Sequence, residues 1–92
     1  MNHEMINIKI PYPLRPLCGG RTHVEGTGET LGDLIMDLSL RYPGIDEMLI
    51  ESGELKGYIH VFAGGGSGQL RSLSDSLNGI SELIIMMAVA GG

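Results

Sequence analysis

The chain has 92 residues, of which 42% are hydrophobic and 18% charged, a composition typical of one small folded domain and not of a disordered chain. Its formal net charge of −5 argues against a nucleic-acid partner, because phosphate binding needs clustered basic side chains, and suits a partner with a basic docking surface. The single cysteine, Cys18, excludes an intramolecular disulfide. With an N-terminus unlike a signal peptide, it predicts a cytoplasmic protein. The longest apolar run, Leu83 to Ala90, is too short for a membrane helix, so no membrane association is expected.

The chain begins with the pattern of a β-hairpin. Residues 5–10 alternate between apolar and polar, which is the period of a half-buried strand. Pro11 and Pro13 end this strand because proline cannot donate a ladder hydrogen bond. We expect a turn over residues 18–21, which contain two glycines, and a returning strand over residues 22–25.

The strongest helix signal starts at Thr30. Its hydroxyl can cap the helix, and the acidic Asp33 follows three residues later, as in a capping box. Apolar residues then recur at helical spacing and form one stripe: Leu31, Leu34, Ile35, Leu38 and Tyr42. Pro43-Gly44 ends the helix, and residues 45–50 are expected to add a short helical turn.

The second half of the chain reads as strands separated by turns. Strands are expected at residues 58–62 and 83–88, and a short edge strand at 70–73. A break is expected at 52–53, a flexible loop or wide hairpin connection at 63–68, and a turn at 75–79. A hairpin, one main helix and further strands predict an α+β roll, with a mixed sheet of four to five strands and the helix packed on one face. The first and last strands are the most apolar, so we place them side by side at the sheet centre. A parallel pairing there is allowed by the long crossover between them.

The apolar residues predict a core and one open surface. Aromatic residues are scarce and six methionines are present, so the core is expected to be aliphatic and methionine-based. Side chains alternate along the last strand. Leu83, Ile85 and Met87 are expected on one face of the sheet, and Ile84, Met86 and Ala88 on the other. If the helix covers one sheet face only, Ile84 and Met86 form a partner-docking surface. A central strand whose second face is covered by loops is the alternative.

Other motifs do not assemble into a catalytic or metal site. The glycine-rich loop at 64–68 lacks a following Lys-Ser/Thr pair, and Gln69 stands where a third phosphate-binding glycine belongs. The histidines His3, His23 and His60 lack metal-ligand spacing. Cys18 has no neighbouring base, which predicts a passive thiol, and the acidic residues Glu47, Glu51 and Glu54 read as a solvated face. We therefore expect no metal and no enzyme activity, but a protein on which other enzymes act.

The sequence closes with Ala88-Val89-Ala90-Gly91-Gly92. We expect a domain over residues 1–87 and a flexible tail over residues 88–92. Because glycine has no Cβ, the last two residues can enter a channel too narrow for other side chains. Nothing crowds the terminal carboxyl carbon, which a partner enzyme could activate with ATP. A frayed end that is glycine by chance is the alternative.

Three features together resemble a known family: this terminal segment, the hairpin–helix–strand order, and residues 10–20 (IPYPLRPLCGG). They resemble the ubiquitin-like β-grasp sulfur carriers, which include the small subunit of molybdopterin synthase, the thiamine-pathway carrier and the carrier that feeds sulfur into cysteine biosynthesis. Residues 30–34 resemble the family's helix start and residues 41–45 its helix end, so the resemblance covers essentially the whole chain. Residues 88–92 look closest to the cysteine-pathway carriers and related molybdopterin-type proteins.

The resemblance implies a carrier cycle. An activating enzyme adenylates Gly92 with ATP and Mg²⁺, a sulfur donor displaces AMP to leave a C-terminal thiocarboxylate, and a downstream synthase accepts the sulfur. The carrier is then a substrate that binds no cofactor stably. Ala88, Val89, Ala90 and Gly91 would thread the partner's active site, held by strand-like pairing along a groove.

Two other functions use the same features. A ubiquitin-like modifier would join Gly92 to substrate lysines through an isopeptide bond, after the same acyl-adenylate step. A scaffold or toxin–antitoxin domain would use the fold for binding alone. The sequence also leaves the sulfur pathway open among the cysteine, molybdopterin, thiamine and homocysteine routes.

Overall fold

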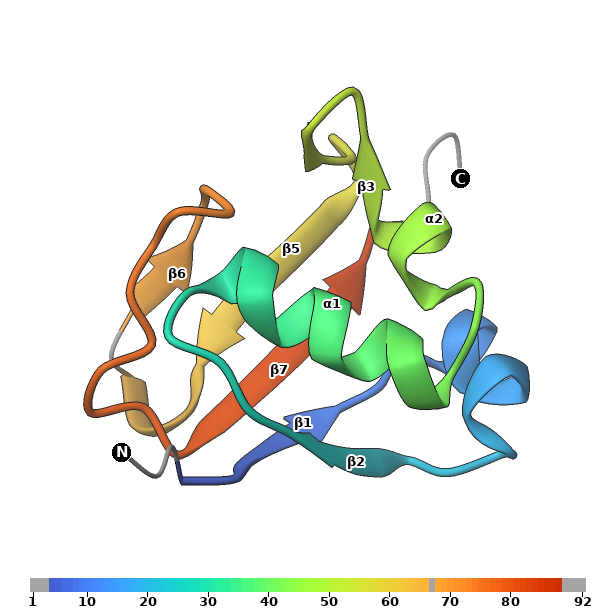
Figure 1. The fold of residues 1–92 in the computed structure, drawn as a ribbon, viewed down its shortest axis with the longest axis horizontal. Helices are drawn as coiled ribbons and strands as arrows, with labels where there is room; N and C mark the ends of the chain where they lie inside the picture. Colours follow the sequence, from blue (N-terminus) through green and yellow to red (C-terminus); the bar gives the residue numbers. More distant parts are fainter. Residues whose placement is uncertain (1–3, 67, 89–92) are drawn as a thin grey trace.

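The computed structural model describes residues 4–66 and 68–88, which form a main sheet with the α-helices on one side of it and a separate two-stranded hairpin (Figure 1). The elements in chain order are β1 (Ile6–Lys9), the 3-10 helix η1 (Tyr12–Cys18), β2 (His23–Gly26), α1 (Leu31–Arg41), α2 (Ile45–Leu49), β3 (Ile50–Glu51), β4 (Glu54–Leu55), β5 (Ile59–Ala63), the 3-10 turn η2 (Gly64–Gly66), β6 (Gly68–Leu70) and β7 (Glu82–Met87). Within these ranges no helix is both long and apolar enough to cross a membrane.

The main sheet has five strands in the order β2-β1-β7-β5-β6. The last strand, β7, occupies the centre, where it runs parallel to β1 with Ile8 opposite Leu83, and antiparallel to β5 with Val61 opposite Ile85. The outer strands pair antiparallel with their neighbours, β2 with β1 and β6 with β5. The mixed sheet, its α+β class and the central parallel pair are all confirmed.

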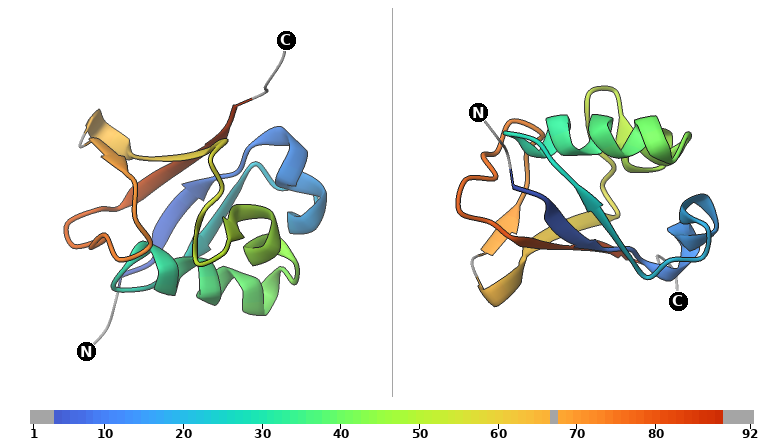
Figure 2. Two further views of the ribbon diagram at one scale, coloured as in Figure 1. Left: turned by 90° about the horizontal axis from the view of Figure 1, so that it is seen from above. Right: turned by 60° about the horizontal axis from the view of Figure 1, so that its bottom comes forward.

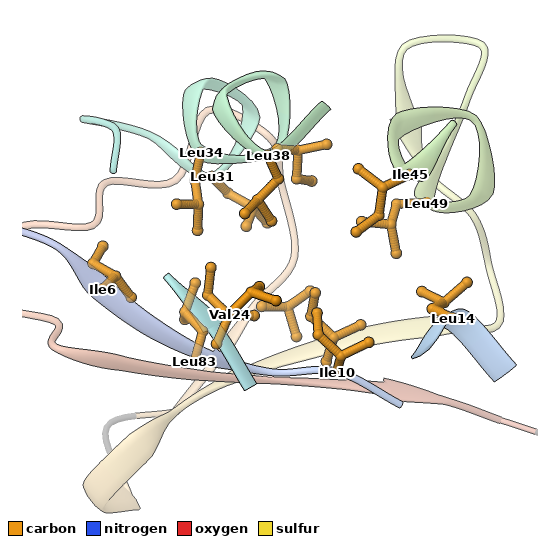
Figure 3. Close-up of a cluster of buried hydrophobic side chains, with 14 of the residues drawn as sticks. Ile6, Ile10, Leu14, Val24, Leu31, Leu34, Leu38, Ile45, Leu49 and Leu83 are labelled. Atoms are coloured by element: carbon orange, nitrogen blue, oxygen red, sulfur yellow. The ribbon is translucent and has the colours of Figure 1, made fainter. Parts of the chain in front are cut away.

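Helix α1 lies across one face of the sheet, as the views in Figure 2 show. The Asp33 backbone N–H donates to the Thr30 hydroxyl at 3.2 Å, so the predicted N-cap forms. The predicted stripe buries Leu31, Leu34, Ile35 and Leu38, and Tyr42 packs beside them half-buried. These side chains meet Ile6, Ile10, Val24 and Leu83 of the sheet layer in the core (Figure 3).

The core is aliphatic, and the expectation that methionines would fill it was wrong. Every fully buried large side chain is Ile, Leu or Val, apart from Cys18. Met5, Met36, Met48 and Met86 are exposed, and Met87 is the one described methionine that packs against the core. The methionines therefore contribute apolar surface, because Ile and Leu stripes already fill the space between helix and sheet.

The 3-10 helix η1 is a short element that the sequence pattern did not predict. Residues 12–18 form η1, whose prolines supply the φ that a helix needs, and Leu14 and Cys18 point from it into the core. Gly19 and Gly20 then take left-handed φ values of 66° and 82° and return the chain to β2, so the predicted turn begins after the buried Cys18.

The break expected at Ser52-Gly53 is the turn of a tight hairpin between β3 and β4. Both residues have positive φ, 55° and 79°, as a two-residue hairpin turn requires. The edge strand expected at residues 70–73 is displaced toward the N-terminus, since β6 covers Gly68–Leu70. From there the Asp75 carboxylate accepts the backbone N–H groups of Arg71 and Ser72, which turns the chain away from the sheet.

Replacing Leu34 by Ala tests the packing of α1 on the sheet. Leu34 is 1% exposed, so Leu34→Ala leaves a cavity and should lower the free energy of unfolding by about 2–5 kcal/mol. Leu40 is 82% exposed on the same helix, so Leu40→Ala should change it by less than about 0.5 kcal/mol. Urea denaturation followed by circular dichroism measures both. Equal destabilisation by the two substitutions would contradict the assignment of the buried face.

Candidate functional site

The central strand β7 has one buried face and one open face. Leu83 and Ile85 are buried toward α1, whereas Ile84 is half-buried and Met86 is 52% exposed on the opposite face. Side chains alternate along a strand, so a strand covered by a helix on one side leaves its second row available. The structure therefore places Ile84 and Met86 where the sequence predicted them, on the side of the sheet away from the helix.

Strand β5 adds an aromatic side chain to this surface. Phe62 lies directly opposite Ile84 in the antiparallel ladder, and His60 lies opposite Met86. Facing residues of paired strands have neighbouring side chains on the same sheet face. Phe62 and His60 are each half-buried. We call Phe62, Ile84 and Met86 the open-face patch.

Polar side chains surround the open-face patch. Lys9 of β1 lies opposite Ile84 from the other side, and one step along the strands Asn7 faces Glu82. His60 approaches Gln69 of β6, with its Nδ1 at 3.3 Å from the amide Nε2. An apolar centre with a polar rim is the anatomy of a protein-binding surface.

The end of β7 leads from this face toward the C-terminal segment. The Ala88 backbone N–H donates to the Tyr58 carbonyl oxygen at 2.8 Å, so β5 still holds the chain at the first residue of the predicted tail. The Ala88 side chain is exposed. The remaining predicted tail residues, Val89, Ala90, Gly91 and Gly92, lie outside the described residues. The described chain thus delivers this segment from the most central strand of the sheet.

Cys18 is fully buried at the end of η1. Burial raises the pKa of its thiol, because the apolar surroundings disfavour the charged thiolate. A protonated, inaccessible thiol is a poor nucleophile, which agrees with the passive role expected from the sequence.

The other motifs take structural positions. Gly64 packs so closely on β7 that an added Cβ would lie 2.8 Å from the Cβ of Glu82, and this close approach accounts for a glycine at the start of the loop. His23 and His60 lie in strands, and Glu47, Glu51 and Glu54 are exposed. Across residues 4–66 and 68–88, no three His, Cys, Asp or Glu side chains gather closely enough to hold a metal ion.

Comparison with known proteins finds relatives that match the chain over nearly its whole length. The sulfur carrier protein CysO of Mycobacterium bovis is 32% identical over 91 residues, which cover 95% of this chain and 98% of that protein. CysO proteins of Mycobacterium tuberculosis match to the same extent. The chain belongs to the ubiquitin-like β-grasp sulfur carriers. No family model matches it.

Solved structures agree with this membership. A chain of the crystal structure of the Amycolatopsis orientalis BexX/CysO complex superimposes on this sulfur carrier with a TM-score of 0.85 at 31% identity, covering 95% of this chain and 99% of that chain. The crystal structure of the Haloferax volcanii modifier protein SAMP1 has a TM-score of 0.76 at 22% identity, covering 97% and 100% of the two chains. At that identity the SAMP1 match shows the shared β-grasp fold alone.

Sequence reasoning missed Phe62 as part of the open face. Its strand was expected, and alternation along residues 58–62 already set Phe62 on the same side as His60. What was missing was the register between β5 and β7, which places Phe62 against Ile84. A register between strands separated by a glycine-rich loop and a long connection is a tertiary property, so no local pattern reports it.

Proposed function

We propose that this sulfur carrier holds sulfur as a thiocarboxylate on Gly92 and delivers it to a biosynthetic synthase. The observation that carries the proposal is the match to CysO sulfur carriers across 98% of their length. The placement of residue 88 at the end of the central strand supports it, because a rigid sheet can then present the following residues to a partner. The body needs no catalytic group for this role, since it acts as a substrate.

The proposed chemistry has two steps. The Gly92 carboxylate attacks the α-phosphorus of Mg²⁺-bound ATP in the activating enzyme, and pyrophosphate leaves as the acyl-adenylate forms. A sulfide equivalent from a sulfur donor then attacks the glycyl carbonyl carbon and expels AMP, which leaves a C-terminal thiocarboxylate. Gly91 and Gly92 contribute the absence of side chains near the reacting carbon. Ala88, Val89 and Ala90 supply a narrow segment for the partner's groove.

The open-face patch is the proposed docking surface for the activating enzyme. It combines one exposed apolar side chain, Met86, and two half-buried ones with proximity to the root of the C-terminal segment, so binding there would orient residues 88–92 toward the partner's active site. The relative in the BexX/CysO complex has a protein partner. The net charge of −5 would favour a partner with a basic rim around its apolar contact.

The relatives named CysO favour the cysteine-type route among the pathways left open. We place the carrier in the cytoplasm, where a reducing environment suits both the single thiol and a sulfur-bearing terminus. The isopeptide-forming modifier is the competing function, and it shares the adenylation step.

Changes at Gly92 test the proposed chemistry. Deleting Gly92, or adding one Ala after it, should abolish thiocarboxylate formation by the activating enzyme, because the reacting carbon is moved or removed. Both variants should melt at the wild-type temperature, since the change lies beyond the last core strand. An Ala added before Met1 is the matched control and should leave product formation unchanged.

Intact-mass spectrometry of the reaction mixture measures the outcome. Normal thiocarboxylate formation by the extended variant would contradict a role for Gly92. Conjugates in which Gly92 is joined to lysines of larger proteins, without any thiocarboxylate, would replace the carrier function by the modifier function.

A substitution on the open-face patch tests docking. Met86→Lys adds a charge at the patch centre and should weaken binding to the activating enzyme by at least about tenfold, the loss expected for one central interface residue. Met36 is 55% exposed on the far side of the molecule, on α1, so Met36→Lys is the matched control and should leave affinity unchanged. Isothermal titration calorimetry measures both. Equal affinities for the two variants would show that the partner docks elsewhere.

A further inference from the structure

Strand β2 forms one edge of the sheet, so within residues 4–66 and 68–88 no strand pairs with its outward backbone groups. The Ile10 N–H donates to the Thr22 carbonyl oxygen, so the backbone groups of residue 22 face β1. Because alternate residues of a strand face the same neighbour, the backbone groups of residues 24 and 26 also face β1. The intervening residues His23 and Glu25 therefore direct their N–H and C=O groups outward. Such an edge is a template for pairing with another chain.

Helix α1 approaches this edge unusually closely at Gly26. An added Cβ at Gly26 would lie 2.8 Å from the Leu34 Cδ1 atom and 3.3 Å from the Asp37 Oδ2 atom. Any larger residue would displace the ends of the Leu34, Leu38 and Asp37 side chains. Gly26 thus brings the side chains of the second half of α1 within reach of the outward backbone groups of β2.

Two charged side chains of α1 bind backbone groups at this edge, one within β2 and one at the residue that follows it. The Asp37 Oδ2 atom accepts the Thr27 backbone N–H at 3.0 Å, and the Arg41 Nη2 atom donates to the Glu25 carbonyl oxygen at 2.6 Å. Asp37 and Arg41 also pair with each other at 3.0 Å, one helical turn apart. Their side chains are 25% and 44% exposed. Asp37 and Arg41 therefore each make two interactions: the ion pair with each other and one hydrogen bond to a backbone group at the strand edge.

We infer that Asp37 and Arg41 form a cap that stops a second copy of this chain from adding its β2 to the edge. The sequence of β2 suits self-pairing once the cap is lost. In an antiparallel pair of two copies centred on Val24, His23 of each copy faces Glu25 of the other, a polar pair of complementary character. This pairing needs the Glu25 carbonyl oxygen as an acceptor for the second copy, and the Arg41 guanidinium already donates a hydrogen bond to that oxygen. The inference is independent of the proposed function.

The double variant Asp37→Ala/Arg41→Ala tests the cap. Sedimentation velocity over a concentration series should show wild-type protein at its monomer mass of 9.8 kDa and the double variant rising toward twice that value. Glu47→Ala/Arg71→Ala removes the same two charges from exposed positions outside β2 and α1, and it should stay monomeric.

A rescue variant identifies the edge that pairs. Adding His23→Pro to the double variant removes an outward N–H without breaking a bond to β1, so it should restore the monomer. A folded double variant that stays monomeric at every concentration would overturn the inference, and so would a dimer that survives His23→Pro.

Amide hydrogen exchange on the wild-type protein keeps the inference testable if the double variant does not fold. The Thr27 amide, held by Asp37, should exchange more slowly than the outward Glu25 amide. Equally fast exchange of the two amides would show that the carboxylate does not cap the edge in solution.

Discussion

The pairing of β7 with β1 is the contact on which the other features depend. It brings the end of the described chain to the middle of the sheet, beside the first strand, and the antiparallel partner β5 closes the ladder on the other side. A central position satisfies the backbone of β7 on both edges. It also lets α1 bury Leu83 and Ile85, while Ile84 and Met86 stay on the open face. A strand at the sheet edge would pair with one neighbour only. It would therefore fix its buried side chains and the segment that follows it less firmly than β7 does.

This arrangement separates the tasks of the protein among its surfaces. Burial between α1 and the sheet supplies stability, the open-face patch is the proposed contact for a partner, and β7 ends where the C-terminal segment begins. The cap that we infer from Asp37 and Arg41 at the β2 edge would add protection from strand pairing. A domain of this size can divide its surfaces in this way because a single helix covers only one face of the sheet.

Much of the fold follows from local patterns in the sequence. The period-2 alternation of residues 5–10 predicts β1, and the Thr30 cap with the stripe from Leu31 to Tyr42 predicts α1, and the structure contains both elements. The exposed methionines were misjudged, because hydrophobicity alone does not say whether space remains in a core already filled by Ile and Leu. The η1 helix does not follow from the strand-ending role of its prolines, although their fixed φ also suits a 3-10 helix.

The candidate site was predictable to the extent that it lies along one strand. Alternation within β7 separated Ile84 and Met86 from the buried set, but Phe62 joined them only through the β5–β7 register. The edge contacts of Asp37 and Arg41 were invisible for the same reason, since they depend on how closely Gly26 lets α1 approach β2. Family resemblance reached further than local pattern, because the order of elements and the terminal motif together carry tertiary information.

The most direct test of the account is the intact mass of the protein purified from its native host. We predict a population heavier than the unmodified chain by the exchange of one oxygen for one sulfur, with fragmentation placing the sulfur on Gly92. Treatment with a thiol-alkylating reagent under native conditions should label this terminal thiocarboxylate, while the buried Cys18 stays unlabelled. Protein that carries no sulfur at Gly92 under conditions of active sulfur assimilation would contradict the carrier function.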